Sequence, residues 1–380
     1  MHVVMLKSQL GNRGGLEKYT LRLGGAFAKR GCKVTILTSN YEGSQEITPG
    51  VKCINVIEHQ PLSVLNVLSF DAACQKWINS HSYDVIFGMD RNRHQTHYRA
   101  GNGVHAAYLK RRREAESWYK SLSFAINPLH KALLYLEKKT YEDPNLKILF
   151  ANSEMVRQEI LELYKTPPEK IKVVHNGVEW EEMQSAFDQW PSTQMEIRRA
   201  LNRNPDSFQL LFAGHGFRRK GLPYLLEGIK ALGNKNIQLS VVGKDRDTRR
   251  WRQKADRMGL SDQVAFFGPQ PTLKPFYQMA DAIAVPSLYD PFANVTIEGL
   301  AMGLFVISSK ANGGHELLTP KTGVTIDDLF NPQSVANALS VALDHKKTIE
   351  SANAIRASVQ SYDFSSQLEK IVSATLDPVQ

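Results

Sequence analysis

The strongest constraint on this chain is the regular alternation of short apolar runs with helix-like segments along all 380 residues. Runs at residues 2–6, 33–38 and 84–88 have the apolar, β-branched character of buried strands. The segments between them, such as residues 15–30, place apolar side chains at helical spacing. Strands that alternate with helices form parallel sheets covered on both faces, so the pattern predicts an α/β protein.

The pattern occurs twice, and the two halves are of similar size. Further strands are expected at 52–57, 147–151 and 171–175, then at 208–213, 237–243, 264–268, 282–286, 305–308 and 323–326. Further helices are expected at 62–81 and 153–164, then at 222–232, 248–258, 273–280, 295–302 and 332–345. We predict two Rossmann-like, doubly wound domains, 1–175 and 176–360, with an interdomain cleft. They join within residues 176–205, a polar and acidic stretch, and a C-terminal helix in 361–380 packs back on one of them, by preference the first.

Composition excludes several classes of protein. With 42% hydrophobic and 22% charged residues, the chain is neither collagen-like nor wholly disordered. Cys32, Cys53 and Cys74 are widely spaced and odd in number, which predicts neither a disulfide framework nor a zinc site and favours a reducing cytoplasm. There is no apolar run long enough to span a bilayer, and the N-terminus is expected to form a strand rather than a signal peptide.

The formal net charge of +9 is unevenly distributed. Residues 1–172 contain 25 basic and 16 acidic residues, whereas the remainder contains 22 of each. All the excess positive charge therefore lies in the first half, which points to a polyanion or a membrane surface as the partner of that half alone.

Two glycine-containing loops each connect a strand directly to a helix. The first, residues 11–15 (GNRGG), would let backbone amides approach an anion at the helix start. It is not a G-x-G-x-x-G motif, and no acid ends the second strand, which argues against a dehydrogenase. The second loop carries Arg218, Arg219 and Lys220 beside a helix N-terminus, where crowded cations favour a bound phosphate or diphosphate. A ligand-free turn and a solvated surface loop are the respective alternatives.

The most specific constellation runs from Asp290 to Glu298 between a strand and a helix. The amides of Phe292, Ala293, Asn294 and Val295 would be free at the helix start to bind phosphate. Glu298 has apolar neighbours, and a carboxylate there needs partners, which the two hydroxyls of a ribose would supply. A buried acid satisfied by backbone donors is the alternative.

These motifs together resemble the retaining family 4 glycosyltransferases of the GT-B fold, over nearly the whole chain. The resemblance rests on Asp290-Pro291-Phe292 with seven residues between Asp290 and Glu298, on residues 11–15, on residues 151–153 (ANS) and on residues 175–178 (HNGV). Residues 98–105 and 219–221 are most similar to bacterial lipopolysaccharide core glucosyltransferases.

The resemblance implies a role for each residue of the donor site. Glu298 would hold the nucleotide ribose, Arg219 and Lys220 would neutralise the diphosphate, and Asp290 would contact sugar hydroxyls. The amides from Phe292 to Val295 would bind phosphate and sugar, and Gly15 would let the first loop approach the phosphates. The chain departs from the family at two places: Asp290 stands where Glu is usual, and His215 stands near a usual Arg, which leaves its role to Arg218 or Arg219.

The family commonly places a His or Asp after a middle strand, facing the sugar or the acceptor. Asn102 and His105 both fall near that place, and His105 is our first choice. Beyond them, Lys110, Arg111, Arg112 and Arg113 precede Trp118, and a stripe of Leu and Lys residues follows to 142. Basic residues with aromatic and apolar ones on a helix are typical of interfacial membrane association, and a charged helix packed on its own domain is the alternative.

The sequence therefore predicts a cytoplasmic glycosyltransferase, peripheral at the inner face of the membrane, that needs no metal or other cofactor. It would move a hexose, first of all glucose from UDP-glucose, to a glycolipid or saccharide such as lipopolysaccharide core. Two alternatives stay open: a sugar-nucleotide epimerase of the same fold, and a basic nucleic-acid-binding protein. Nucleic acid is the less favoured partner because the most specific anion site falls in the neutral half.

Overall fold

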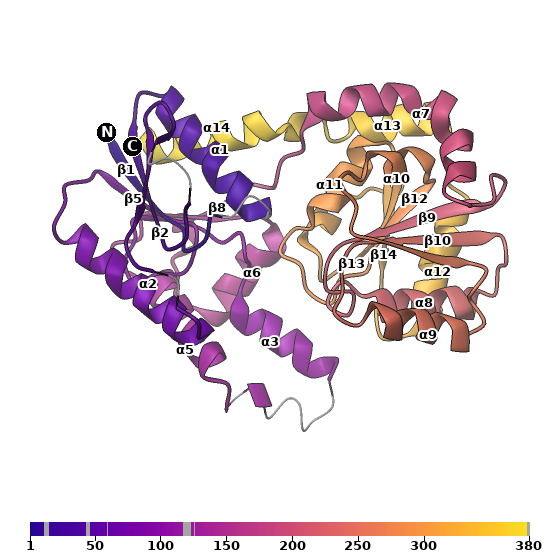
Figure 1. The fold of residues 1–380 in the computed structure, drawn as a ribbon, viewed down its shortest axis with the longest axis horizontal. Helices are drawn as coiled ribbons and strands as arrows, with labels where there is room; N and C mark the ends of the chain where they lie inside the picture. The colour runs from indigo at the N-terminus through magenta and orange to yellow at the C-terminus, as the bar shows by residue number, and fades with distance from the viewer. Residues whose placement is uncertain (11–14, 43–45, 59, 117–122, 125, 378–380) are drawn as a thin grey trace. The chain divides into compact units, whose positions relative to one another are not determined.

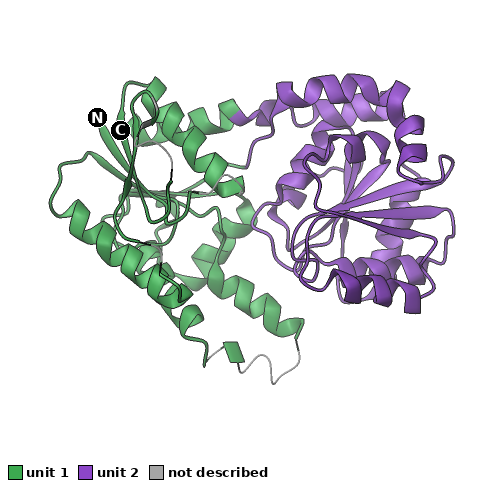
Figure 2. Cartoon of the chain, in the orientation of Figure 1, with its two compact units in different colours: residues 1–175, 365–380 green, residues 176–364 purple. Residues whose placement is uncertain are grey.

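The chain folds into two compact units, each built on one sheet (Figures 1 and 2). The computed structural model describes residues 1–10, 15–42, 46–58, 60–116, 123–124 and 126–377. Unit 1 comprises residues 1–175 and 365–380, and unit 2 comprises residues 176–364. In both, helices cover the two faces of a largely parallel sheet. The α/β fold class predicted from the alternating pattern is confirmed, and all the predicted strands are present to within two residues at each end.

Unit 1 contains an eight-stranded sheet of order β3-β4-β2-β1-β5-β6-β7-β8. Its neighbouring strands are parallel except for the edge pair β3 and β4. The strands are β1 His2–Leu6, β2 Lys33–Thr38, β3 Glu46–Thr48, β4 Val51–Asn55, β5 Val85–Gly88, β6 His97–Arg99, β7 Ile148–Ala151 and β8 Ile171–Val173. The helices are α1 Gly15–Lys29, α2 Ser63–Ile78, α3 His105–Glu114, α5 Pro128–Tyr141, α6 Glu154–Leu163, a 3-10 turn Pro168–Lys170 and α14 Phe364–Leu376. Strands β3 and β6 were not predicted, because three residues are too few to show a period.

Along β1, successive apolar side chains point to opposite faces of the sheet, so both faces must be covered by helices. Val4 and Leu6 pack with α2 through Phe70 and Cys74, whereas Met5 approaches α1 at Gly24. α14 is tied to the end of α1, since Arg30 pairs with Glu369 and with Asp377. No helix among the described residues is long and apolar enough to cross a bilayer.

Unit 2 contains a six-stranded parallel sheet of order β11-β10-β9-β12-β13-β14. Its strands are β9 Phe208–Ala213, β10 Ile237–Val242, β11 Val264–Gly268, β12 Ala282–Val285, β13 Phe305–Ser309 and β14 Gly323–Ile326. Its helices are α7 Trp180–Ala200, α8 Leu222–Leu232, α9 Thr248–Arg257, α10 Lys274–Met279, α11 Asn294–Ala301, α12 Pro332–Leu343 and α13 Ile349–Ala357, with 3-10 turns Gly313–Leu317 and Gln360–Tyr362. One apolar core joins α7, α10, α11 and α13 to one face of the sheet, and another joins α8, α9 and α12 to the opposite face.

No helix was predicted within residues 176–205, where the two domains were expected to join, yet α7 occupies most of this stretch. Met183, Ala186, Phe187 and Trp190 are buried on one face of that helix at helical spacing. Acidic residues around them and Pro191 inside the helix weaken the amphipathic signal in the sequence. Packing against α10 decides the outcome over local propensity.

A buried charged cluster lies beneath α7. The Arg198 guanidinium donates to Asp281 at 2.9 Å, and both side chains are almost fully buried. Lys347 lies near them, with its Nζ 4.2 Å from the Trp190 ring. Burial lowers the pKa of Lys347 to about 7, so the ammonium form is disfavoured in the folded protein.

This cluster predicts a specific dependence of stability on pH. An unfolded Lys keeps a pKa near 10.5, so between pH 7 and 10 the unfolded state binds more protons at this group. The free energy of unfolding should therefore gain a contribution that rises with pH, at up to about 1.4 kcal/mol per pH unit. Lys347→Met should remove that rise. Urea unfolding of both proteins at pH 7 and pH 9 measures it, and equal rises in the two would contradict the prediction.

Candidate active site

The candidate donor site lies at the carboxyl ends of β9 and β12, where the strand order of the second sheet reverses. The loop after β9 is fixed to the loop after β12 by a close backbone approach at Gly221. Gly221 has φ +85°, and a Cβ there would lie 1.7 Å from the Pro286 carbonyl oxygen, so only glycine fits. The Leu288 amide also donates to the Arg219 carbonyl at 2.8 Å. The cationic loop is thereby held next to Asp290.

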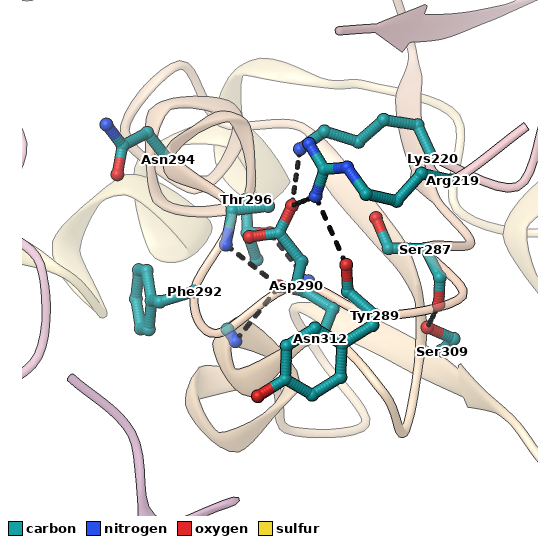
Figure 3. A network of polar contacts seen from close by, with 12 residues as sticks. Arg219, Lys220, Ser287, Tyr289, Asp290, Phe292, Asn294, Thr296, Ser309 and Asn312 are labelled. Atoms are coloured by element: carbon teal, nitrogen blue, oxygen red, sulfur yellow. Dashed lines mark hydrogen bonds and ion pairs between the residues drawn. The ribbon is translucent and has the colours of Figure 1, made fainter. Parts of the chain in front are cut away.

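Asp290 contacts two of the three cations of that loop (Figure 3). Its Oδ2 accepts from Lys220 Nζ at 2.5 Å and from Arg219 at 3.4 Å. Arg219 also donates to the Tyr289 carbonyl at 3.2 Å. The Asp290 and Lys220 side chains are 9% and 14% exposed, whereas Arg219 is 42% exposed. The structure thus brings together three residues that the sequence assigned to one donor site, from positions 70 residues apart.

Asn312, a residue that the sequence analysis missed, fixes the loop that carries Asp290 (Figure 3). Its fully buried side chain accepts from the Ala293 amide at 2.9 Å and donates to Thr296 Oγ1 at 2.9 Å. The backbone adds bonds on both sides, since the Asp290 amide donates to the Ala311 carbonyl and the Gly313 amide to the Asp290 carbonyl. The signal available was a polar Asn three residues after the end of the buried strand β13.

The same contact corrects the prediction of four free amides from Phe292 to Val295. The Ala293 amide is occupied by Asn312 and is therefore not available to a phosphate. Asn294 and Val295 are the first residues of α11, so their amides have no acceptor within the helix and remain suited to an anion. The Phe292 carbonyl accepts from Asn176, whose side chain also donates to Asn294 Oδ1 at 2.7 Å.

Glu298 follows one turn into α11 and is bonded to Tyr277 of α10. The Tyr277 hydroxyl donates to Glu298 Oε2 at 2.6 Å, and no described residue donates to the other oxygen. Burial raises the pKa of Glu298 above its ordinary 4.5, while the Tyr277 hydrogen bond and Lys220 oppose that rise. Burial also raises the pKa of Tyr277 well above 10, so its hydroxyl stays protonated as a donor. One carboxylate oxygen is held and the other is left for a ligand hydroxyl.

Arg218 does not join its two neighbours. Its side chain is exposed and lines a different hollow, together with His215 and residues at the start of α9. Of the two residues considered for the usual arginine role, only Arg219 reaches Asp290. In the first unit, Gly15 is the first residue of α1, and residues 11–14 of the predicted glycine loop lie outside the described residues.

His105 and Asn102 follow β6 in unit 1. Asn102 is exposed in a turn closed by the Gly103 amide on the Ala100 carbonyl, at 3.0 Å. His105 begins α3, and its Nε2 lies 3.1 Å from His130 Nδ1. Burial, with the positive charge of Arg91, lowers the pKa of His105 to about 4, so its imidazole is neutral at pH 7.

A buried acid that the sequence analysis missed, Glu137 of α5, holds this turn in place. It accepts from the amides of His105 and Ala106, at 2.5 and 3.0 Å, and thereby caps α3. It also accepts from Arg91 Nε at 2.8 Å and from the Tyr164 hydroxyl at 2.6 Å. Glu137 is fully buried. In the sequence it stands next to Lys138 and Lys139 beside the apolar stripe of α5, like a surface acid.

Glu137→Gln is therefore expected to lower the free energy of unfolding by about 3 kcal/mol, since Arg91 would stay buried without its counter-charge. The matched control is Glu154→Gln, which breaks the half-buried pair of Glu154 with Arg157 within α6 and should cost under about 1 kcal/mol. Urea unfolding at pH 7 compares the two. Similar losses in both variants would contradict a special role for Glu137.

A second ion pair missed by the sequence analysis lies where the strand order of the first sheet reverses, between β1 and β5. Lys7 donates to both oxygens of Asp90, at 3.0 and 3.1 Å, and Ser8 donates to Asp90 through its amide and its hydroxyl. Although burial acts to raise it, these donors hold the pKa of Asp90 below its ordinary 3.8. The side chains at this position are thus charged and fixed.

The basic segment of unit 1, Lys110 to Arg113, contains both packed and exposed side chains. The Arg112 guanidinium lies 4.4 Å from the centre of the Phe124 ring, so it packs against the protein. Lys110 and Arg113 are exposed and Arg111 is partly so. Trp118 lies outside the described residues. Among the described residues, no group of three or more His, Cys, Asp or Glu side chains is arranged to hold a metal.

Two family models match the chain in consecutive parts. The model "Glycosyltransferase Family 4" matches residues 13–182, and "Glycosyl transferases group 1" matches residues 193–359. The chain therefore belongs to the family of glycosyltransferases that these two models describe. The "Glycosyl transferases group 1" model covers most of unit 2. Its range includes Arg219, Lys220, Asp290 and Glu298. The family suggested by the sequence motifs is confirmed.

Related proteins align with most of this chain at modest sequence identity. An uncharacterized glycosyltransferase of Methanocaldococcus jannaschii is 27% identical over 346 residues, which cover 85% of this chain and 83% of the relative. The lipopolysaccharide glucosyltransferase WaaG of Escherichia coli is 23% identical over 335 residues, covering 87% and 86%. The crystal structure of WaaG matches with a TM-score of 0.81 at 20% identity, covering 99% and 100%.

HepE of Anabaena, crystallised with UDP-glucose, has a TM-score of 0.69 at 18% identity and full coverage of both chains. At these sequence identities, the structural matches are evidence for the fold alone. They confirm the predicted GT-B architecture of two Rossmann-like units.

Proposed function

We propose that this protein is a retaining glycosyltransferase that moves a hexose, first of all glucose, from a nucleotide-diphosphate sugar to a glycolipid or saccharide acceptor. The observation that carries the proposal is the convergence of Lys220 and Arg219 on Asp290 beside the start of α11, with Glu298 one turn further. UDP-glucose is the preferred donor, supported by the name of WaaG and by the ligand of HepE. Lipopolysaccharide core is the preferred acceptor on the same ground.

In this proposal the site works by stabilising the leaving diphosphate. Negative charge develops on the diphosphate as the sugar departs, and Lys220, Arg219 and the amides of Asn294 and Val295 supply fixed positive charge. These groups are already in place before the donor binds, so little reorganisation opposes the reaction. Retention of configuration follows the family resemblance.

Asp290 and Glu298 would position the two ends of the donor. Asp290 Oδ2 accepts both cations, and its Oδ1 remains for a hydroxyl of the transferred sugar. The unoccupied oxygen of Glu298 would accept from a ribose hydroxyl, with Tyr277 holding the other. On the acceptor side we now prefer Asn102, because it is exposed, whereas His105 is engaged with His130.

We also propose that unit 1 binds the inner face of the cytoplasmic membrane through its basic segment. The exposed Lys110 and Arg113 of α3 and the 73% exposed Ile126 combine charge with apolar surface, which suits an anionic bilayer. The exposed Lys131, Lys138 and Lys139 of α5 add further positive charge. An anionic glycolipid acceptor would then lie in the same surface.

Replacing Arg111 and Arg113 together by Gln should weaken binding to vesicles containing phosphatidylglycerol by about tenfold or more, because each basic residue near such a surface contributes about 1 kcal/mol. Vesicle co-sedimentation measures the effect. The control replaces Arg249 and Arg257 of α9, which are exposed in unit 2. Undiminished binding by the first variant would refute the membrane role.

The proposed activity is tested by incubating the protein with radiolabelled UDP-glucose and lipopolysaccharide that lacks its outer core hexoses. Label transferred to the glycolipid, with the anomeric configuration of the donor by NMR, is the expected result. An epimerase would instead convert the sugar nucleotide without any acceptor. Absence of transfer to any glycolipid or saccharide acceptor, from UDP-, GDP- and ADP-sugars alike, would refute the proposal.

A further inference from the structure

We propose that unit 2 contains a second anion site, for the phosphate group of a small molecule other than the sugar donor. The site is a hollow of about 530 Å³ at the starts of α8 and α9, and we call it the basic hollow. Its defining side chains are His215, Arg218, Lys244, Arg246, Arg250 and Trp251. Its size is within the range of small-molecule sites.

Charge is the first argument for an anionic ligand. Four cations line the basic hollow, and the only acids in its lining are Asp245 and Asp247. Lys244, Arg246 and Arg250 are exposed and form no ion pair with a described residue. Like charges gathered around one concavity repel one another unless an anion neutralises them, and arginine guanidinium groups match the oxygens of a phosphate.

Asp245 acts within the protein and does not compete for these cations. It accepts from the Phe217 amide at 2.7 Å and from the Trp251 indole nitrogen at 3.1 Å. Its Oδ1 also accepts from the Asp247 amide at 2.8 Å. The carboxylate thus joins the loop after β9 to the loop after β10, which fixes the walls of the hollow.

Two ring systems suit the remainder of such a ligand. Trp251 is 9% exposed and lines the hollow, so the little surface that its indole leaves exposed can contact the group that carries the phosphate. His215 Nδ1 accepts from the Lys244 amide at 2.9 Å, so Nε2 carries the proton in this tautomer and is one more donor. Cations, a ring donor and an aromatic wall together indicate a phosphate ester of a sugar-sized molecule.

The basic hollow is separate from the donor site because the two lie on opposite layers of unit 2. Glu298 and Tyr277 belong to α11 and α10, which pack on one face of the sheet, whereas Trp251 and Arg250 belong to α9 on the other face (Figure 1). The loop after β9 stands between them: Lys220 contacts Asp290, while Arg218 lines the hollow. The proposal therefore does not depend on the identity of the donor.

Isothermal titration of the full chain with glucose 6-phosphate tests the proposal. We expect one binding site, and at least a tenfold loss of affinity in the double variant Arg246→Gln, Arg250→Gln. The double variant Arg249→Gln, Arg257→Gln removes the same charge from α9 at exposed positions outside the lining, and should bind within twofold of the wild type. Lys220→Gln should also retain binding.

No binding of glucose 6-phosphate by the wild-type chain would overturn the proposal. Equal losses in the two arginine double variants would reduce the effect to net charge, and loss in Lys220→Gln alone would place the ligand in the donor site; either result also overturns it. Thermal unfolding of each variant, expected at the wild-type temperature because all four arginines are exposed, shows that the fold is kept.

Discussion

Replacing Lys220 by Gln should lower kcat by about a thousandfold, or about 4 kcal/mol, with a smaller change in KM. Lys220 lies 2.5 Å from Asp290 with only 14% of its side chain exposed, so its charge is weakly screened by solvent. The negative charge of the leaving diphosphate is larger in the transition state than in the bound donor. An interaction with that charge therefore contributes more to kcat than to binding.

The matched control for this variant is Lys230→Gln, which removes the same charge at the exposed far end of α8, the helix that follows Lys220 in the chain. It should leave kcat within twofold of the wild type. Steady-state transfer from UDP-glucose compares the two variants. If Lys220→Gln keeps more than a tenth of the wild-type kcat, the leaving-group role assigned to Lys220 is wrong.

Glu298→Ala is the second variant with a large expected effect: kcat/KM for the donor should fall about a thousandfold while the fold is retained. Hydrogen bonds to a charged group are worth about 1.5–3 kcal/mol each, and the oxygen of Glu298 that Tyr277 does not occupy can accept from both ribose hydroxyls. Tyr277→Phe removes only the bond that orients the carboxylate, so its loss should be near tenfold. Glu227→Gln, at a half-buried pair with Lys254 between α8 and α9, is the control and should have no effect.

The pH dependence of donor binding provides an independent check on the same residue. Because the pKa of Glu298 is raised above 4.5 by burial, donor affinity should fall with decreasing pH at a higher pH than an exposed carboxyl would protonate. The Tyr277 bond lowers that pKa, so in Tyr277→Phe the decline should begin at a higher pH. Unchanged onset in the variant would contradict the pairing of the two side chains. A Glu298→Ala variant with the kcat/KM of the wild type would refute the role of Glu298 in donor binding altogether.

The sequence predicted those parts of the fold that depend on long local patterns. Strands such as β9 and β10, with six mostly apolar residues each, show the pattern of a buried sheet. The three residues of β6 do not, and that strand exists because it pairs with β5 and β7. Helix α7 was hidden by its acidic residues and Pro191, and its packing against α10 involves residues about 90 positions away.

The residue types of the site could be predicted from the sequence, whereas most contacts between those residues could not. Asp290, Glu298, Arg219 and Lys220 follow from motifs at strand ends, yet their pairing depends on how Gly221 approaches Pro286. The sequence could not show that Asn312 occupies the Ala293 amide, or that Arg218 turns toward another hollow. Glu137 was missed for the same reason, since its partners come from α3, α6 and the loop after β5. Such contacts arise from tertiary packing and leave no local period.

The central claim is that Asp290, Lys220 and Glu298 form the binding site of a nucleotide-diphosphate sugar. Thermal unfolding in the presence of UDP, GDP, ADP and their glucose esters tests it most directly, with Glu298→Ala and Glu227→Gln alongside the wild type. We expect one nucleotide, first of all UDP, to raise the unfolding temperature of the wild type and of Glu227→Gln and to leave Glu298→Ala unchanged. A shift of equal size in Glu298→Ala, or no shift with any nucleotide, would contradict the claim.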